Sequence, residues 1–349
     1  MKKIAICIPS YNESENIENI TLKIDKSLEY FEKNFIVEII NCDNNSPDLT
    51  NKLFESVKTK HKKVSIVTSE KGKGINLLNF FEYFLKNNFD YGFTIDADLK
   101  SFKFDWLPKM YTKLKEGNNL VLPLYKRRKE EGNTTNHFVL PMLYEIYGKF
   151  YRQPIGGDYA FDKKYVEKIM KQKFTKNILL YGIDIFMVVT AIVHKLKIDE
   201  VYLGEKKHSP SYNKMENIFE SVLRGFSEVY KQYGKLNKKD KFNYKTFKSE
   251  SICEFRKEFD EKYIFALNKS KLSNNYEEIL KYWNSLLIEY KNSIGYPSED
   301  LIKKMKYGFI ARSVSFWDEM SKRKEINWEE ILLKEIVFFK EEKNEIKNN

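Results

Sequence analysis

Tyr91-Gly92-Phe93-Thr94-Ile95-Asp96-Ala97-Asp98-Leu99 is a short apolar run that leads into two carboxylates one residue apart. Side chains at positions i and i+2 of an extended strand point to the same side, so Asp96 and Asp98 can face one ligand. Mg²⁺ and Mn²⁺ accept one or two carboxylates together with the oxygens of a substrate diphosphate. Because Asp is also common in ordinary strand-to-loop turns, the surrounding sequence has to decide between the two interpretations.

Apolar runs with the length of buried strands recur along the first part of the chain and alternate with helical patterns. They cover residues 3–9, 35–41, 64–68, 91–96, 120–124 and 198–203. This alternation predicts an α/β fold with right-handed βαβ units and a mostly parallel sheet. Ligands of such sheets bind beyond the carboxyl ends of the strands. Polar clusters at 10–13, 43–46, 70–74 and 96–98 are all expected at that edge.

Composition narrows the class of protein. The 349 residues carry 61 Lys and Arg against 50 Asp and Glu, a formal net charge of +11 that favours anionic partners, although Lys is abundant throughout the chain. Cys7, Cys42 and Cys253 show no metal-type spacing. The N-terminus lacks the pattern of a secretion signal, and the longest apolar run, 178–193, is too short to span a bilayer. These features predict a soluble cytoplasmic protein without stable membrane insertion.

Four short motifs together resemble the nucleotide-sugar half of GT-A glycosyltransferases: Ile8-Pro9-Ser10-Tyr11-Asn12-Glu13, Asp43-Asn44-Asn45-Ser46, Gly72-Lys73-Gly74 and Asp96-Ala97-Asp98. Further on, the stretches 153–160 and 181–185 and His208 are similar in order to the retaining mannosylglycerate synthases and glucosyl-3-phosphoglycerate synthases. The resemblance covers about residues 1–212. It implies a GT-A domain there, followed by a mostly helical region at 213–349 that packs on it or forms an oligomer interface, as in a homodimer.

The resemblance assigns donor-binding roles to residues at the strand ends. It implies that the nucleotide sugar, a GDP- or UDP-hexose, contacts Pro9, Tyr11, Glu13, Asp43, Lys73, Asp96, Ala97, Gly156 and Gly157. Each has a plainer alternative: a helix N-terminus stabilises Glu13, Asp43 forms an Asx-turn, and Lys73 is a solvated side chain in a glycine turn. Backbone N–H groups around Lys73 also suit a phosphate.

The same resemblance implies a divalent cofactor, Mg²⁺ or Mn²⁺, held by Asp98 and His208. Catalysis would involve Asp98, Asp158, Asp184 and Arg127, with Asp158 against sugar hydroxyls where relatives carry Glu. An N-cap role explains Asp184 nearly as well. Retaining relatives are thought to let the leaving diphosphate oxygen take the acceptor proton, which makes charge stabilisation the main catalytic tool.

The acceptor is expected to contact residues of the middle segment, namely Arg128, Asn133, Thr135 and Tyr181. Phosphoglycerate-using relatives carry Gly-Arg-x-Thr here, whereas this chain has Gly132-Asn133-Thr134-Thr135. Since an Arg fork is the expected partner of a phosphate, its absence favours an unphosphorylated hydroxy acid such as glycerate, or a phosphate reached by Arg127, Arg128 or Arg152. Residues 129–136 read as a flexible polar loop suited to a lid.

Other functions stay open at this point. A transferase acting on polyprenyl phosphate or another glycan would share the same donor motifs. A nucleotidyltransferase would want a Gly-rich basic loop directly after the first strand, where this chain has Ser10-Tyr11-Asn12-Glu13. A basic nucleic-acid-binding protein is favoured by net charge alone, but acids are interspersed and no recognition motif is present. We therefore expect a hexosyltransferase with no nucleic-acid partner.

Overall fold

A computed structural model describes residues 1–207, 214–236, 259–323 and 327–345. The chain divides into two compact units. The first comprises 1–125, 153–212 and 224–229, and the second comprises 126–152, 213–223 and 230–349. The sequence placed a boundary between 212 and 213; the structure in addition counts 126–152 with the helical unit and a short part of one helix with the sheet unit.

A seven-stranded sheet forms the centre of the first unit. Its strands lie in the order β3-β2-β1-β4-β6-β5-β7. Neighbours β3, β2, β1 and β4 are parallel, and β6 runs antiparallel to both β4 and β5. All the predicted strands are present, whereas the short β6 was not predicted. The strands are β1 (Lys2–Ser10), β2 (Phe35–Asp43), β3 (Lys62–Val67), β4 (Tyr91–Thr94), β5 (Leu120–Lys126), β6 (Tyr159–Asp162) and β7 (Ile198–Glu205).

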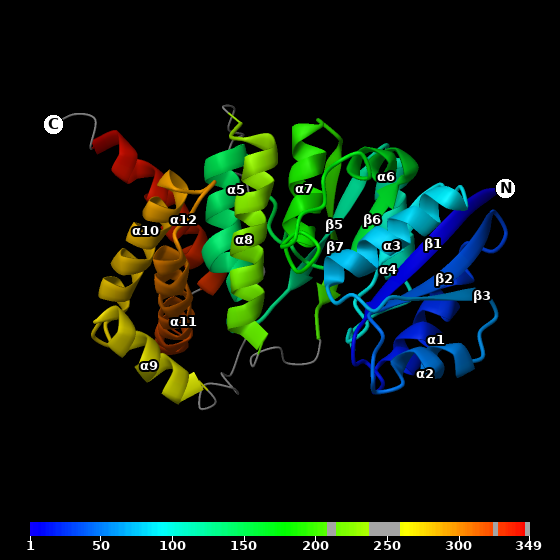
Figure 1. The fold of residues 1–349 in the computed structure, drawn as a ribbon, viewed down its shortest axis with the longest axis horizontal. Coiled ribbons are helices and arrows are strands. Elements are labelled where there is room, and N and C mark those ends of the chain that lie inside the picture. Colours follow the sequence, from blue (N-terminus) through cyan, green and yellow to red (C-terminus); the bar gives the residue numbers. More distant parts are fainter. Residues whose placement is uncertain (208–213, 237–258, 324–326, 346–349) are drawn as a thin grey trace. The chain divides into compact units, whose positions relative to one another are not determined.

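Helices cover both faces of this sheet (Figure 1). On one face, α1 (Ile17–Leu28), α2 (Thr50–Ser56) and α4 (Trp106–Lys115) bury apolar side chains against alternate residues of β1 such as Ile4 and Ile6. On the other face lies α3 (Lys73–Lys86), whose Phe80, Phe81 and Phe84 pack around Phe161 of β6. The helices α6 (Lys163–Ile169) and α7 (Ile183–Val193) complete the unit.

The second unit is helical. It contains the π-helical turn η1 (Thr135–Val139), α5 (Leu140–Tyr147), α9 (Asp260–Ser270), α10 (Tyr276–Asn292), α11 (Glu299–Lys322) and α12 (Trp328–Glu345), while α8 (Met215–Tyr233) belongs partly to each unit. The predicted helical character of this region is confirmed, and its helices bury apolar side chains such as Ile279, Trp283, Met305 and Phe309. The rings of Phe219 and Phe309 stack with 4.1 Å between their centroids.

The expectation of a flexible polar loop at 129–136 is wrong. Lys129, Glu130 and the residues from Asn133 onward are buried, and helical structure begins at Asn133 and continues into η1 at Thr135. Asn133 explains why a polar segment is tolerated inside this unit. Its amide donates to the carbonyl oxygen of Glu130 at 2.7 Å and its Oδ1 accepts from Trp317 Nε1 at 3.0 Å. Buried polar groups with partners do not need solvent.

The long apolar run at 178–193 is explained by burial within the sheet unit. Every residue of α7 from Ile183 to Val189 is buried. Within the part of the chain that the structure describes, no helix has the length and apolar character needed to cross a membrane.

Candidate functional site

The carboxyl ends of β1, β2 and β4 meet at one edge of the sheet. Ser10 pairs with Asp43 in the β1–β2 register, and Cys7 of β1 pairs with Thr94 at the end of β4. Ile95 continues this line because its N–H donates to the carbonyl oxygen of Cys7 at 2.9 Å. The loops that carry Pro9, Asp43 and Asp96 therefore emerge side by side, as the strand pattern predicted.

A cluster of alternating charges lies at this edge, with Asp96 at its centre. Lys73 Nζ, at the start of α3, lies 3.2 Å from Asp96 Oδ1 and 3.3 Å from Asp184 Oδ2. Lys206 Nζ, just after β7, lies 3.1 Å from Asp96 Oδ2 and 2.6 Å from Asp158 Oδ2. These five residues are called the charge cluster below. The alternative of a solvated Lys73 is wrong, because its side chain is only 14% exposed.

The charge cluster shifts the pKa values of its members in opposite directions. Burial favours the neutral acid at Asp96, but Lys73 and Lys206 outweigh it and lower the pKa of Asp96 well below its ordinary value. Burial likewise opposes the charge of Lys73, yet Asp184 and Asp96 outweigh it and raise the pKa of that ammonium. Both groups are therefore charged at neutral pH.

Asp184 behaves differently from Asp96. Burial raises its pKa, with Lys73 acting against that effect. Its Oδ1 is buried without a hydrogen-bond partner. The alternative of an N-cap is wrong, since Gly182 occupies that position and Asp184 lies inside α7. A buried carboxylate oxygen without a donor is costly unless a ligand group supplies one, so Asp184 suits contact with a bound molecule.

Asp158 is engaged by protein groups on both oxygens. Its Oδ1 accepts from the Asp96 backbone N–H at 2.9 Å, and its Oδ2 accepts from Tyr125 Oη at 2.6 Å as well as from Lys206. The side chain is fully buried. Asp158 therefore fixes the backbone at Asp96, a role that the sequence analysis did not predict.

The Gly156-Gly157 pair allows the loop before β6 to approach Asp96. Gly157 has φ +89°, and a Cβ built there would lie 2.2 Å from Asp96 Oδ2. The carbonyl oxygen of the neighbouring Gly156 accepts a hydrogen bond from Lys206 Nζ at 2.9 Å. Gly157 is thus required by its close approach to Asp96, whereas a Cβ at Gly156 would instead lie 2.4 Å from Pro123 Cγ.

Gly72-Lys73-Gly74 is tied to the segment before α7. The N–H groups of Gly74 and Ile75 donate to the carbonyl oxygens of Leu180 and Leu179 at 3.0 and 3.1 Å. The N–H groups of Gly74 and Ile75 are therefore already used. The expected phosphate contact at this turn stays a prediction for Lys73 alone. The ammonium group of Lys73 still lies at the edge of the sheet, between Asp96 and Asp184. Tyr181, in the same segment, is 38% exposed.

The nucleoside residues expected from the sequence surround the ends of β1 and β2. Asp43 is buried and accepts from Ser46 N, Ser46 Oγ and Ser10 Oγ at 2.7, 2.7 and 2.9 Å, so its Asx-turn is real. Glu13 Oε2 accepts from Asn16 Nδ2 at 2.8 Å, and Tyr11 Oη accepts from Lys71 Nζ at 2.7 Å. Pro9 is half-buried at the end of β1.

Two asparagines link these loops, and sequence reasoning missed them. Asn44 Nδ2 donates to Asn76 Oδ1 at 2.6 Å and to the Glu70 carbonyl oxygen at 2.9 Å, while Asn44 Oδ1 accepts from Gly72 N at 3.2 Å. Asn76 Nδ2 donates to the Ser10 carbonyl oxygen at 3.2 Å. Lys206 was also missed. Its place directly after a predicted strand was the signal that could have found it.

Asp98 lies half-buried two residues beyond Asp96, and Ala97 between them is buried. Next to this loop, the N–H groups of Lys100 and Ser101 donate to the carbonyl oxygen of Lys207 at 2.8 and 3.3 Å. His208, the expected second metal ligand, lies outside the described residues. Among the residues that are described, no group of three or more His, Cys, Asp or Glu side chains is arranged to hold a metal ion.

The remaining predicted residues belong to the helical unit. Arg128 lies 3.5 Å from Glu131 through Nε, Asn133 is bonded as described above, and Thr135 opens η1. Arg127 is half-buried. The structure describes these four side chains within their own unit, so their predicted acceptor and catalytic roles stay predictions.

Comparisons with known proteins agree with this geometry. Residues 5–175 match the family described as Glycosyl transferase family 2. A dolichol-phosphate mannosyltransferase of Pyrococcus furiosus is 26% identical over 258 residues, which cover 69% of this chain and 67% of that protein.

Solved structures of glucosyl-3-phosphoglycerate synthase from Mycobacterium tuberculosis resemble the chain in fold. The complex with Mn²⁺, UDP and glucosyl-3-phosphoglycerate has a TM-score of 0.53 at 21% identity and covers 68% of this chain and 81% of that one. The complex with Mn²⁺, UDP and phosphoglyceric acid has a TM-score of 0.54 at 22% identity, covering 68% and 80%. The predicted GT-A architecture with a helical C-terminal region is confirmed.

Proposed function

We propose that the protein, a glycosyltransferase whose residues 5–175 match the Glycosyl transferase family 2 model, moves a hexose from GDP-mannose or UDP-glucose to a small hydroxy acid. Glycerate and 3-phosphoglycerate are the acceptors considered. The transfer depends on a divalent ion, Mg²⁺ or Mn²⁺, which Asp98 and His208 hold and which binds the donor diphosphate.

The observation that carries this proposal is the charge balance at the sheet edge. The carboxylates of Asp96, Asp158 and Asp184 pair with the two ammonium groups of Lys73 and Lys206, and Asp98 follows two residues after Asp96 on the same loop. With all of these groups ionised, the four carboxylates exceed the two ammonium groups by two negative charges. A diphosphate brought to this edge alone would be repelled. A divalent cation held by Asp98 would offset this excess and would supply positive charge for the diphosphate.

The residues present fit such an ion. Mg²⁺ and Mn²⁺ in nucleotide sites are held by one or two carboxylates and by substrate oxygens, so a complete cage of protein ligands is not needed. Asp96 is committed to two ammonium groups, which leaves Asp98 as the candidate direct ligand on this loop. The bound ion would supply charge stabilisation for the leaving diphosphate.

Support for a hydroxy-acid acceptor comes from the solved relatives. Two solved structures similar in fold contain phosphoglyceric acid or glucosyl-3-phosphoglycerate beside Mn²⁺ and UDP. Asn133 stands where the phosphoglycerate-using families carry an Arg, and its amide is occupied inside the helical unit. Without that guanidinium, glycerate is favoured over its phosphate ester.

A transfer assay tests the proposal. UDP-glucose and GDP-mannose are each incubated with glycerate or 3-phosphoglycerate and Mn²⁺, and the glycosylated acid is detected by mass spectrometry. We expect product with one donor, and its loss in Asp98→Asn. Asp105→Asn, which removes an exposed carboxylate paired with Lys109, serves as the matched control and should keep full activity. Activity that is unchanged in Asp98→Asn would contradict the metal assignment.

A second candidate function is transfer to polyprenyl phosphate, supported by the relative that is named dolichol-phosphate mannosyltransferase. The same assay includes a short polyprenyl phosphate in detergent micelles. Product with polyprenyl phosphate and none with either acid would show that the acceptor is the lipid. The proposed metal requirement at Asp98 would be the same in that case.

A further inference from the structure

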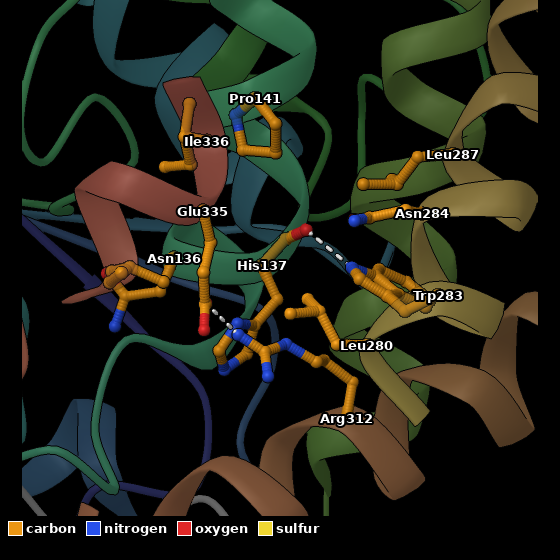
Figure 2. Close-up of a pocket in the computed structure, with 11 residues that line it drawn as sticks. Asn136, His137, Pro141, Leu280, Trp283, Asn284, Leu287, Arg312, Glu335 and Ile336 are labelled. Carbon is orange, nitrogen blue, oxygen red and sulfur yellow. Dashed lines mark hydrogen bonds and ion pairs between the residues drawn. The ribbon is translucent and has the colours of Figure 1, made fainter. Parts of the chain in front are cut away.

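The helical unit contains a cavity whose lining includes none of the residues assigned above to the transfer reaction (Figure 2). Its lining comes from η1, α5, α10, α11 and α12. The space measures about 300 Å³, including the part that opens to solvent. Apolar side chains such as Leu280 and Leu287 form much of the wall.

A buried guanidinium lies in this apolar wall. Arg312 is 2% exposed, and it forms an ion pair with Glu335 through Nη2. Its guanidinium carbon lies 5.1 Å from the ring centroids of both Tyr276 and Phe316. The opposite nitrogen, Nη1, is buried and has no hydrogen-bond partner. A buried guanidinium N–H without an acceptor is costly, so the site is built for an acceptor that is not part of the chain.

A second polar atom without a partner faces the same cavity. His137 is 3% exposed, and its main-chain carbonyl oxygen accepts from Trp283 Nε1 at 3.0 Å, which fixes the residue. Its ring meets Phe316 edge-on at 5.2 Å, while Nε2 is buried without a partner. Burial and the nearby Arg312 lower the pKa of His137, so the imidazole is neutral and can donate from Nε2.

Among the described residues that line the cavity, Glu335 has the carboxylate that could accept hydrogen bonds from Arg312 Nη1 and His137 Nε2, but both of its oxygens already have partners. The two oxygens of Glu335 pair with Arg312 and Tyr276. Figure 2 shows the His137 ring, the Arg312 guanidinium and Glu335 converging at the cavity. We propose that this cavity binds a small carboxylate, with one oxygen on Arg312 Nη1, the other on His137 Nε2 and its carbon chain against Leu280 and Leu287.

Calorimetric titration of the full chain with sodium acetate, at constant ionic strength kept with sodium chloride, tests the site. Leu280→Trp fills the cavity with an indole, and Ile288→Trp adds the same group at an exposed position of the same helix. We expect acetate affinity to fall at least about tenfold in Leu280→Trp and to stay unchanged in Ile288→Trp. His137→Phe keeps the ring contact with Phe316 and removes Nε2, so affinity should fall roughly tenfold.

Asp98→Asn separates this site from the transfer site. Acetate binding that persists in Asp98→Asn supports a separate cavity, and it does so whether or not the proposed transfer reaction is found. The proposal is overturned by acetate binding that survives in Leu280→Trp, by binding that disappears in Asp98→Asn, or by the absence of any heat with acetate. A crystal structure with only water between Arg312 and His137 in acetate would overturn it as well.

Discussion

At the scale of single residues, the transfer site depends on two lysines that share one carboxylate. Asp96 accepts Lys73 on one oxygen and Lys206 on the other, and Lys206 also holds the fully buried Asp158. Removing one partner of a buried ion pair leaves an uncompensated charge, which costs far more than losing a surface pair. The lysines therefore hold Asp96 and Asp158 in place at the edge where we propose that the metal and the donor bind.

Lys206→Met should raise the pH at which the protein unfolds in acid. The pKa of Asp96 lies below its unfolded value, so its stabilising effect is present above the ordinary Asp range and is lost as pH falls through the folded-state pKa. Without Lys206 this pKa moves upward, and stability is lost at higher pH. Circular dichroism during acid titration measures the midpoint.

Lys109→Met is the control for that titration, because it breaks an exposed pair with Asp105. Its acid midpoint should stay near the wild-type value. An unchanged acid midpoint in Lys206→Met would show that the ion pairs of Lys206 do not lower the pKa of Asp96 enough to stabilise the fold.

Gly157→Ala should abolish metal-dependent nucleotide binding. Both Gly157 and Gly117 have positive φ values, +89° and +88°, so alanine at either position costs about 1 kcal/mol of folding free energy in backbone strain. A Cβ at Gly157 would also lie 2.2 Å from Asp96 Oδ2, whereas nothing lies within 4 Å of one at Gly117. Urea unfolding and nucleotide titration of both variants separate strain from the collision; equal nucleotide binding in the two would refute the proposed geometry.

At the scale of elements, the start of α3 is held by backbone hydrogen bonds to the segment before α7. Gly74 allows this contact, since a Cβ there would lie 2.2 Å from the Ile178 carbonyl oxygen. Backbone cannot move aside as a flexible side chain can, so the helix itself would have to shift, and Lys73 with it.

Gly74→Ala should therefore lower the free energy of unfolding by more than about 2 kcal/mol, despite the better helix propensity of alanine. Glu82→Ala, at an exposed position of the same helix, should change it by less than about 0.5 kcal/mol. Urea denaturation compares the two. A stabilised Gly74→Ala would show that α3 is not constrained by residues 178–180.

At the scale of the whole molecule, the sequence predicted the sheet and its functional edge well. The spacing of apolar residues along the chain indicates which side of a strand or helix is buried, so strands and helices can be predicted from it. The motifs at 43–46, 70–74 and 96–98 then fall at or just beyond the ends of predicted strands. The hydrogen-bond and ion-pair partners of each polar side chain were harder to predict, because these partners lie far away in the sequence. Lys206 and Asp96 are 110 positions apart in the sequence, and no local sequence pattern predicts their ion pair.

The same limit explains the error at residues 129–136. Their polarity predicts solvent exposure, but Asn133 meets Trp317, which lies 184 positions further along the chain. The cavity around Arg312 was missed for a similar reason. It combines residues of η1, α10, α11 and α12, and only the fold brings His137, Arg312 and Glu335 together.

The central claim is that a divalent ion must join the nucleotide to the edge formed by Asp96, Asp98, Lys73 and Lys206. Calorimetric titration with UDP and with GDP, in Mn²⁺ and then in EDTA, tests it most directly on the wild-type chain and on Asp98→Ala. We predict binding of one nucleotide in Mn²⁺, with none in EDTA and none in Asp98→Ala. Binding of equal strength in EDTA or in Asp98→Ala would contradict the claim.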